Sequence, residues 1–117
     1  VRVVVAGNQT ARAGELLRAL ELPVDAVAVS AEWGVAKPAR EFFTRVVDLA
    51  AADGPGEVLY VGDHPANDVF PAAECGLRTA HLRRGPWGHL WADDPKVRQT
   101  ADWSIDGLAE LTRIVGG

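Results

Sequence analysis

Two aspartates follow a short apolar run near the middle of the chain. Residues 58–61 read Val-Leu-Tyr-Val and lead into Gly62-Asp63, and a second carboxylate follows at Asp68. An apolar run without polar alternation is typical of a parallel strand covered on both faces. Open α/β sheets bind ligands at the carboxyl edge of such strands. Because paired carboxylates offer the hard oxygen ligands that Mg²⁺ prefers, the pattern predicts a magnesium site formed by Asp63 and Asp68.

The same residues fit a plainer interpretation. Gly-Asp after a strand is also typical of a simple turn. Asn67 or Asp68, at the start of the next helical pattern, is also typical of a helix N-cap. Taken alone, the segment supports the metal site and the turn-and-cap arrangement equally.

Two further segments place polar groups where strands are expected to end. Asn8 and Thr10 follow the first apolar run, and Lys37 comes just before Pro38 and the strongest helical pattern. The start of a helix can bind an anion, and a fixed ammonium group can neutralise phosphate oxygens or a carboxylate nucleophile. Each has a plainer alternative, since Asn8 and Thr10 can cap a helix and most lysines are solvated surface residues.

Strand-like and helix-like patterns alternate along the chain. This alternation predicts an α/β fold with a parallel sheet and helices on both faces. The expected strands are residues 1–6, 26–29, 58–61 and 79–82. The expected helices are residues 10–20, 38–52, 67–74 and 105–115. Residues 84–103 are expected to form a long loop.

Composition limits the class of protein. The chain has 117 residues, 48% hydrophobic and 24% charged, as in one globular domain with a modest core. The net charge of −4 offers no basic surface for nucleic acid or membrane. Cys75 is the single cysteine, so no intrachain disulfide can form, and we predict a reducing, cytoplasmic compartment. No apolar run reaches transmembrane length, and no signal peptide is visible.

Two motifs lie in a fixed order about 25 residues apart. The first is Gly34-Val35-Ala36-Lys37-Pro38, and the second is Val-Gly-Asp-His-Pro-Ala-Asn-Asp-Val over residues 61–69. This combination is fairly specific, and it resembles the haloacid dehalogenase-like (HAD) hydrolase superfamily. The resemblance continues through Glu41, Phe42, Phe43, Ala73, Gly76, Leu77, Arg78, Thr79, Arg84, Gly85 and residues 101–108.

The resemblance implies a Rossmann-like, three-layer α/β/α fold and a Mg²⁺-dependent phosphatase that acts on a small phosphorylated metabolite through an aspartyl-phosphate. It implies that Lys37 steadies the nucleophile and the phosphoryl group, and that Asp63 binds Mg²⁺ directly. Asp68 matches the second acid, which acts on the metal directly or through water. Gly7 and Asn8 match the phosphate-binding segment, in which Gly7 stands where a Ser or Thr is usual.

The family's nucleophilic aspartate lies in an Asp-x-Asp motif on a central strand, ahead of the segment that matches residues 1–6. We therefore expect residues 1–117 to be the C-terminal portion of a HAD-like core domain. The nucleophile strand and any cap domain are expected upstream, in the remainder of the same polypeptide, and these 117 residues alone are expected to be inactive. Without the central strand, each buried unpaired backbone group costs about 1–3 kcal/mol, against a total stability of roughly 5–15 kcal/mol.

Two other functions remain open at this stage. One is a catalytically inactive HAD-like binding or regulatory module, which Gly7 favours. The other is a metal-independent haloacid dehalogenase, and Gly62-Asp63 argues against it because a metal-binding acid has no role there. A receiver-like or flavodoxin-like domain is a weaker alternative, because Lys37-Pro38 followed by Gly62-Asp63 is not its pattern. The sequence predicts neither the substrate, the cap type nor the oligomeric state.

Overall fold

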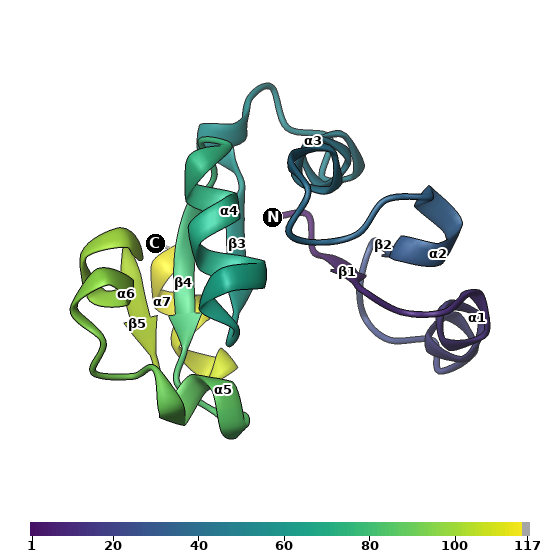
Figure 1. Cartoon of the computed structure of the whole chain (residues 1–117). Helices are drawn as coiled ribbons and strands as arrows, with labels where there is room; N and C mark the ends of the chain where they lie inside the picture. Colours follow the sequence, from purple (N-terminus) through teal and green to yellow (C-terminus); the bar gives the residue numbers. More distant parts are fainter. Residues whose placement is uncertain (116–117) are drawn as a thin grey trace.

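Short parallel strands alternate with helices in the computed structural model, which describes residues 1–115 (Figure 1). The strands are β1 (Val4–Gly7), β2 (Ala26–Val29), β3 (Leu59–Gly62), β4 (Arg78–Leu82) and β5 (Trp103–Ile105). The α-helices are α1 (Ala11–Ala19), α2 (Ser30–Trp33), α3 (Arg40–Leu49), α4 (Phe70–Glu74), α5 (Gly85–Leu90), α6 (Pro95–Thr100) and α7 (Leu111–Val115). Shorter turns of 3-10 helix lie at η1 (Pro55–Glu57) and η3 (Leu108–Glu110), and a π-helical turn lies at η2 (Pro65–Val69). No helix within residues 1–115 is long and apolar enough to cross a membrane.

The strands form two separate parallel sheets. β1 pairs with β2, in register from Val4 opposite Ala26. The second sheet has the order β3-β4-β5. Figure 1 shows β1 and β2 to the right of the three-stranded sheet. The parallel pairing confirms the predicted α/β class, and among residues 1–115 no strand joins β1 to β3.

The main core forms where α3 packs against β3 and α4. Phe42 and Phe43 of α3 are both fully buried, and Phe43 meets Tyr60 of β3 edge to face at 5.1 Å between ring centroids. Trp33 meets Phe42 in the same manner at 5.1 Å. Such pairs add about 0.5–1.5 kcal/mol beyond the burial of their apolar area. These consecutive aromatic contacts therefore hold α3, and with it the turn that precedes α3, against the three-stranded sheet.

The first helix begins as the sequence predicts. Thr10 is the N-cap of α1, and its Oγ1 accepts a hydrogen bond from the Ala13 N–H at 3.1 Å. The best helical pattern is shorter than predicted, because α3 begins at Arg40 rather than at Pro38. The Lys37–Pro38 peptide bond is cis and lies in the turn before the helix.

The prediction of a long loop over residues 84–103 is wrong. This segment holds α5 and α6 and leads into β5. Its Gly-Pro and Asp-Pro pairs begin helices, since Pro86 and Pro95 lie in the first turns. Asp94 caps α6 by accepting hydrogen bonds from the N–H groups of Lys96 and Val97 at 2.9 and 3.1 Å. The predicted helix over residues 105–115 is also reduced, to η3 and α7.

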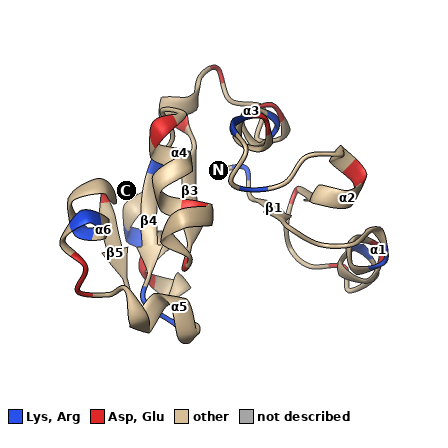
Figure 2. Cartoon of the chain, viewed as in Figure 1, with Lys and Arg blue, Asp and Glu red and all other residues tan. Residues whose placement is uncertain are grey.

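Charged side chains are spread over both sheets and their helices. Figure 2 shows Lys and Arg scattered over several elements rather than gathered on one face.

Removing one core ring tests this packing. We expect Phe43→Ala to lower the free energy of unfolding by about 3–5 kcal/mol, because it empties a fully buried site. The measurement is urea unfolding of the natural polypeptide that contains these residues. Arg45→Ala, on the exposed side of α3, is the control and should stay within about 0.5 kcal/mol of the wild type. Equal losses for both variants would contradict this location of the core.

Candidate functional site

The polar residues singled out in the sequence meet at one edge of the structure. β1 ends at Gly7 and β3 ends at Gly62, so Asn8 and Asp63 both follow the carboxyl ends of parallel strands. Lys37 lies in the turn before α3, next to these ends. Although β1 and β3 belong to separate sheets, Asn8 bonds to Lys37 and Lys37 bonds to Asp68, so side-chain contacts link the two strand ends.

Lys37 lies in a largely buried ion pair. Its Nζ is 2.6 Å from Asp68 Oδ1, and the two side chains are only 15% and 5% exposed. The rings of Phe42 and Tyr60 face Nζ, with their centroids 5.9 and 5.8 Å away. A cation near the face of an aromatic ring is attracted to it. Lys37 is therefore no solvated surface lysine, and its charge is held in one place.

Both oxygens of Asp68 are engaged. Oδ1 accepts from Lys37, and Oδ2 accepts a hydrogen bond from the His64 N–H at 3.0 Å. The π-helical turn η2 brings this carboxylate back over the end of β3, where a Cβ at Gly62 would overlap it. Only a glycine leaves room for this approach. In this geometry Asp68 fixes Lys37 and the loop after β3, and a metal contact of Asp68 stays a prediction.

Asp63 differs from Asp68 in its contacts. Its carboxylate is partly exposed and makes no hydrogen bond or ion pair within residues 1–115. Its backbone carbonyl accepts a hydrogen bond from Nε2 of His81, at 3.1 Å. Because a carbonyl can only accept, Nε2 carries the proton of His81, and the buried Nδ1 has no partner in the described part of the chain. This hydrogen bond from His81 of β4 therefore fixes the backbone at Asp63.

These groups fit one part of a magnesium site. An unpaired carboxylate such as that of Asp63 is a suitable ligand, since Mg²⁺ prefers one or two carboxylates together with water and phosphate oxygens. Within residues 1–115, no group of three or more His, Cys, Asp or Glu side chains could hold a metal ion. Further ligands for Mg²⁺ would have to come from substrate, water or other parts of the polypeptide.

Asn8 connects the end of β1 to the lysine turn. Its Nδ2 donates to the carbonyl oxygen of Lys37 at 3.0 Å, and its Oδ1 accepts from the N–H of Lys37 at 2.8 Å. Both ends of the amide group are engaged, so a phosphate contact from Asn8 would have to use its backbone. Gly7 pairs with Val29 in the sheet. A Cβ added at Gly7 would have only the Gln9 side chain within 4 Å, so the position is not crowded. Thr10 caps α1, as the plainer interpretation holds.

The sequence analysis missed Phe42 and Tyr60 as the surroundings of Lys37. One signal was available, because residues two apart on a strand face the same side. Tyr60 and Gly62 therefore lie on the same face of β3, and the missing side chain of Gly62 leaves space for Asp68.

Burial, and then the nearby Asp68 carboxylate, raise the pKa of Tyr60 well above its usual range.

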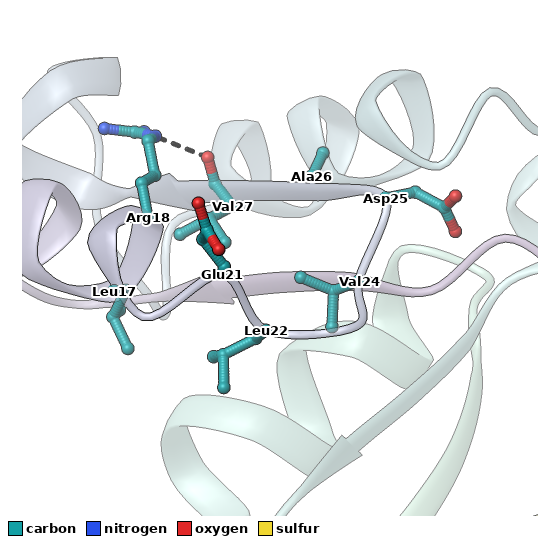
Figure 3. A pocket seen from close by; sticks show the side chains of 8 residues that line it. All are labelled: Leu17, Arg18, Glu21, Leu22, Val24, Asp25, Ala26 and Val27. Atoms are coloured by element: carbon teal, nitrogen blue, oxygen red, sulfur yellow. Dashed lines mark hydrogen bonds between the residues drawn. The ribbon is translucent and has the colours of Figure 1, made fainter.

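A surface hollow of about 400 Å³ lies between α1 and β2 (Figure 3). It is lined by Leu17, Arg18, Glu21, Leu22, Val24, Asp25, Ala26 and Val27. These residues include the amino end of β2, whereas the polar residues described above follow the carboxyl ends of strands. Arg18 donates to the carbonyl oxygen of Val27 at 3.0 Å and pairs with Glu32. The arginine thus satisfies a backbone carbonyl on β2. This hollow is separate from the polar residues of the candidate site.

The fold and the site together define a Rossmann-like α/β domain with a buried lysine–aspartate pair beside a partly exposed aspartate. The model of a family described as HAD-hydrolase-like matches residues 34–111. The chain belongs to the HAD-like hydrolase family.

Curated relatives agree with this assignment. The chain is 38% identical over 96 residues to a phospholysine phosphohistidine inorganic pyrophosphate phosphatase of Danio rerio, covering 82% of this chain and 33% of that protein. It is 33% identical over 91 residues to a glyceraldehyde 3-phosphate phosphatase of Methanocaldococcus jannaschii, covering 78% of this chain and 37% of that protein. The chain thus spans about a third of the length of these relatives.

Solved structures show the same fold. A HAD phosphatase from Thermococcus onnurineus superposes with a TM-score of 0.75 at 24% identity, covering 99% of this chain and 51% of that one. A 2-haloacid dehalogenase from Pseudomonas syringae superposes with a TM-score of 0.73 at 24% identity, covering 98% of this chain and 46% of that one. Since a phosphatase and a dehalogenase fit almost equally well, the fold does not select the reaction.

Adding one methyl group tests the contact between β3 and Asp68. We expect Gly62→Ala to lower the free energy of unfolding by about 1–3 kcal/mol, because the new Cβ overlaps the Asp68 carboxyl group. Gly56→Ala is the matched control, since its Cβ would have no neighbour within 4 Å. It should leave stability unchanged or raise it by up to about 1 kcal/mol. Chemical denaturation of both variants decides, and a neutral Gly62→Ala would contradict the close approach.

The raised pKa of Tyr60 gives a prediction about alkaline pH. Because folding favours the neutral phenol, Tyr60 leaves stability unaffected below its ordinary pKa of about 10 and lowers it as the pH rises further. Stability of the wild-type polypeptide should therefore fall more steeply above pH 10 than that of Tyr60→Phe, by up to about 1.4 kcal/mol per pH unit. Denaturant unfolding at stepped pH measures the difference. If the stability of the two proteins fell equally with pH, the raised pKa of Tyr60 in the folded state would be wrong.

Proposed function

We propose that this chain is part of a Mg²⁺-dependent phosphatase that hydrolyses a small phosphorylated metabolite. The observation that carries the proposal is the buried Lys37–Asp68 ion pair beside the unpaired carboxylate of Asp63. The names of the phosphatase relatives support the same reaction. The single cysteine of the chain supports a reducing, cytoplasmic location for it.

Lys37 and Asp63 are the catalytic residues in this proposal. Lys37 directs a fixed ammonium group at the phosphate oxygens, where the transition state is most negative, and Asp68 and Asn8 hold it there. Asp63 binds Mg²⁺, with Asp68 as the second acid acting directly or through water. A Mg²⁺ ion held there would screen the negative charge between the nucleophile and the phosphate. At the end of β1, Gly7 and Asn8 offer backbone N–H groups to the phosphate oxygens.

The nucleophile in this proposal is an aspartate in the remainder of the same polypeptide. It attacks phosphorus, the ester oxygen leaves, and water later cleaves the aspartyl-phosphate. The two separate sheets support this arrangement, since β1 and β3 each have a side that pairs with no strand within residues 1–115. A parallel strand between β1 and β3 would satisfy both sides and bring its carboxyl end to the same edge.

A catalytically inactive binding or regulatory module is the second candidate. Gly7 supplies no hydroxyl group to phosphate, and the side chain of Asn8 is occupied by Lys37. Both observations weaken the phosphate-binding segment and favour this candidate. A metal-independent haloacid dehalogenase remains the third, supported by fold likeness alone.

The decisive experiment is an assay of the purified natural polypeptide on a panel of phosphate monoesters, with Mg²⁺ and then with a chelator. We expect Mg²⁺-dependent hydrolysis, and we expect Asp63→Asn to lower kcat/KM by about 100- to 1,000-fold while raising the Mg²⁺ concentration required. Asp53→Asn replaces an exposed aspartate that lies outside both motifs, so it is the matched control and should retain wild-type kinetics.

The outcomes separate the three candidates. Hydrolysis that survives chelation, or an active Asp63→Asn, would rule out the proposed metal role. Halide release from haloacids without metal would establish the dehalogenase. A folded polypeptide that binds a phosphorylated ligand and turns over neither substrate class would establish the binding module.

A further inference from the structure

An aromatic pair stands next to the residue that binds metal in the proposed reaction. His64 follows Asp63 directly, and its ring lies against Trp87 of α5, with the ring centroids 4.6 Å apart and the planes inclined by 50°. Trp87 is 47% exposed, although it is among the largest apolar side chains of the protein. A large aromatic surface left open at the rim of a site is a common feature of ligand recognition.

The position of Trp87 is built into the fold. A Cβ at Gly88 would overlap the carbonyl oxygen of Leu82 and lie 2.9 Å from the carbonyl carbon of Arg83, so α5 rests directly on the carboxyl end of β4. Gly85 has φ of +72°, and a Cβ there would be 3.2 Å from Asp63 Oδ2. Figure 1 shows α5 beyond the end of β4. Backbone contacts therefore hold the helix, and with it Trp87, beside Asp63.

The orientation of His64 is fixed as well. Its Nδ1 accepts a hydrogen bond from the Asn67 N–H at 3.2 Å. The neutral ring therefore carries its proton on Nε2, and Nε2 makes no hydrogen bond within residues 1–115. The pair thus offers two complementary features, an open indole surface and a directed N–H donor.

We propose that Trp87 and His64 form a subsite for a planar, hydrogen-bond-accepting ring in the leaving group, so that the substrate is a nucleoside monophosphate. The ring stacks on the exposed part of Trp87, and the Nε2–H of His64 donates to a ring nitrogen or carbonyl oxygen. His64 follows Asp63 directly and α5 begins beside the Asp63 carboxylate, so the subsite lies next to the proposed phosphate site, where the leaving group would be. The inference rests on the proposed phosphatase function and specifies its substrate class.

Two probes isolate the ring. Adenosine 5′-monophosphate and ribose 5-phosphate share the phosphate and the sugar, and only the first carries a base. In the full natural polypeptide with Mg²⁺, we expect a higher kcat/KM for the nucleotide, with the difference in KM. Trp87→Leu should reduce the ratio of the two kcat/KM values by about 5- to 20-fold, since base stacking on an aromatic side chain contributes that order of affinity.

Two further variants control the result. Trp91→Leu removes the other partly exposed tryptophan near α5, which is 38% exposed, and should leave the ratio within about 2-fold of the wild type. Trp87→Phe keeps a smaller ring for stacking and should retain most of the preference. An equal loss on both probes, or the same ratio in Trp87→Leu and the wild type, would overturn the subsite.

A failure of the proposed phosphatase function can be distinguished from a failure of the subsite. If the polypeptide hydrolyses neither probe, calorimetric binding of the same two compounds tests the subsite alone. Tighter binding of the nucleotide that Trp87→Leu abolishes would then support the subsite without the reaction. Equal binding of the two probes would overturn the subsite. So would acrylamide quenching that is no weaker in ligand-free Trp87→Leu than in the wild type, because the indole of Trp87 would then be covered by other parts of the protein.

Discussion

The arrangement of the site depends on one interaction, the buried ion pair between Lys37 and Asp68. Lys37 comes from the turn before α3 and is tied to the end of β1 by Asn8, whereas Asp68 lies in the turn after β3. The pair therefore joins the two sheets at the edge where they approach the site. It also explains the glycine at the end of β3, because any side chain at Gly62 would displace the carboxylate from its place.

Stability alone does not account for such a pair. The desolvation of two charges offsets most of their attraction, so that apolar residues of similar volume often stabilise a core equally well or better. The ion pair does fix the position of an ammonium group in a setting that leaves it little freedom. Phe42 and Tyr60 face the same nitrogen atom, and the lysine side chain is only 15% exposed. A charge held in place before substrate arrives needs no reorganisation during reaction, and the catalytic role proposed for Lys37 would use this advantage.

Local signals predicted the elements that depend on local interactions. Residues 26–29 form β2 with the predicted bounds, and Thr10 caps α1 as expected. The motifs also led us to expect Lys37 and Asp68 near one another, and the structure shows them in contact as an ion pair. The helices within residues 84–103 were missed, because Gly-Pro and Asp-Pro are loop signals unless tertiary packing continues them into a helix. The role of Asn8 was missed for another reason, as its partner lies 29 residues away and only the folded sheet brings them together.

The engagement of Asn8 changes how the end of β1 should be judged. A hydroxyl group is absent at Gly7, and the amide of Asn8 is used to hold Lys37, so neither side chain is available for phosphate. Backbone N–H groups at the end of a strand need no side chain to bind an anion, and a glycine allows the closest approach of the anion to them. In the proposed phosphatase, Asn8 would act on phosphate indirectly, through the lysine turn that its side chain holds. The departure from the usual Ser or Thr therefore leaves the end of β1 with backbone N–H groups alone for an anion, and this is the feature on which the phosphatase and the binding module differ.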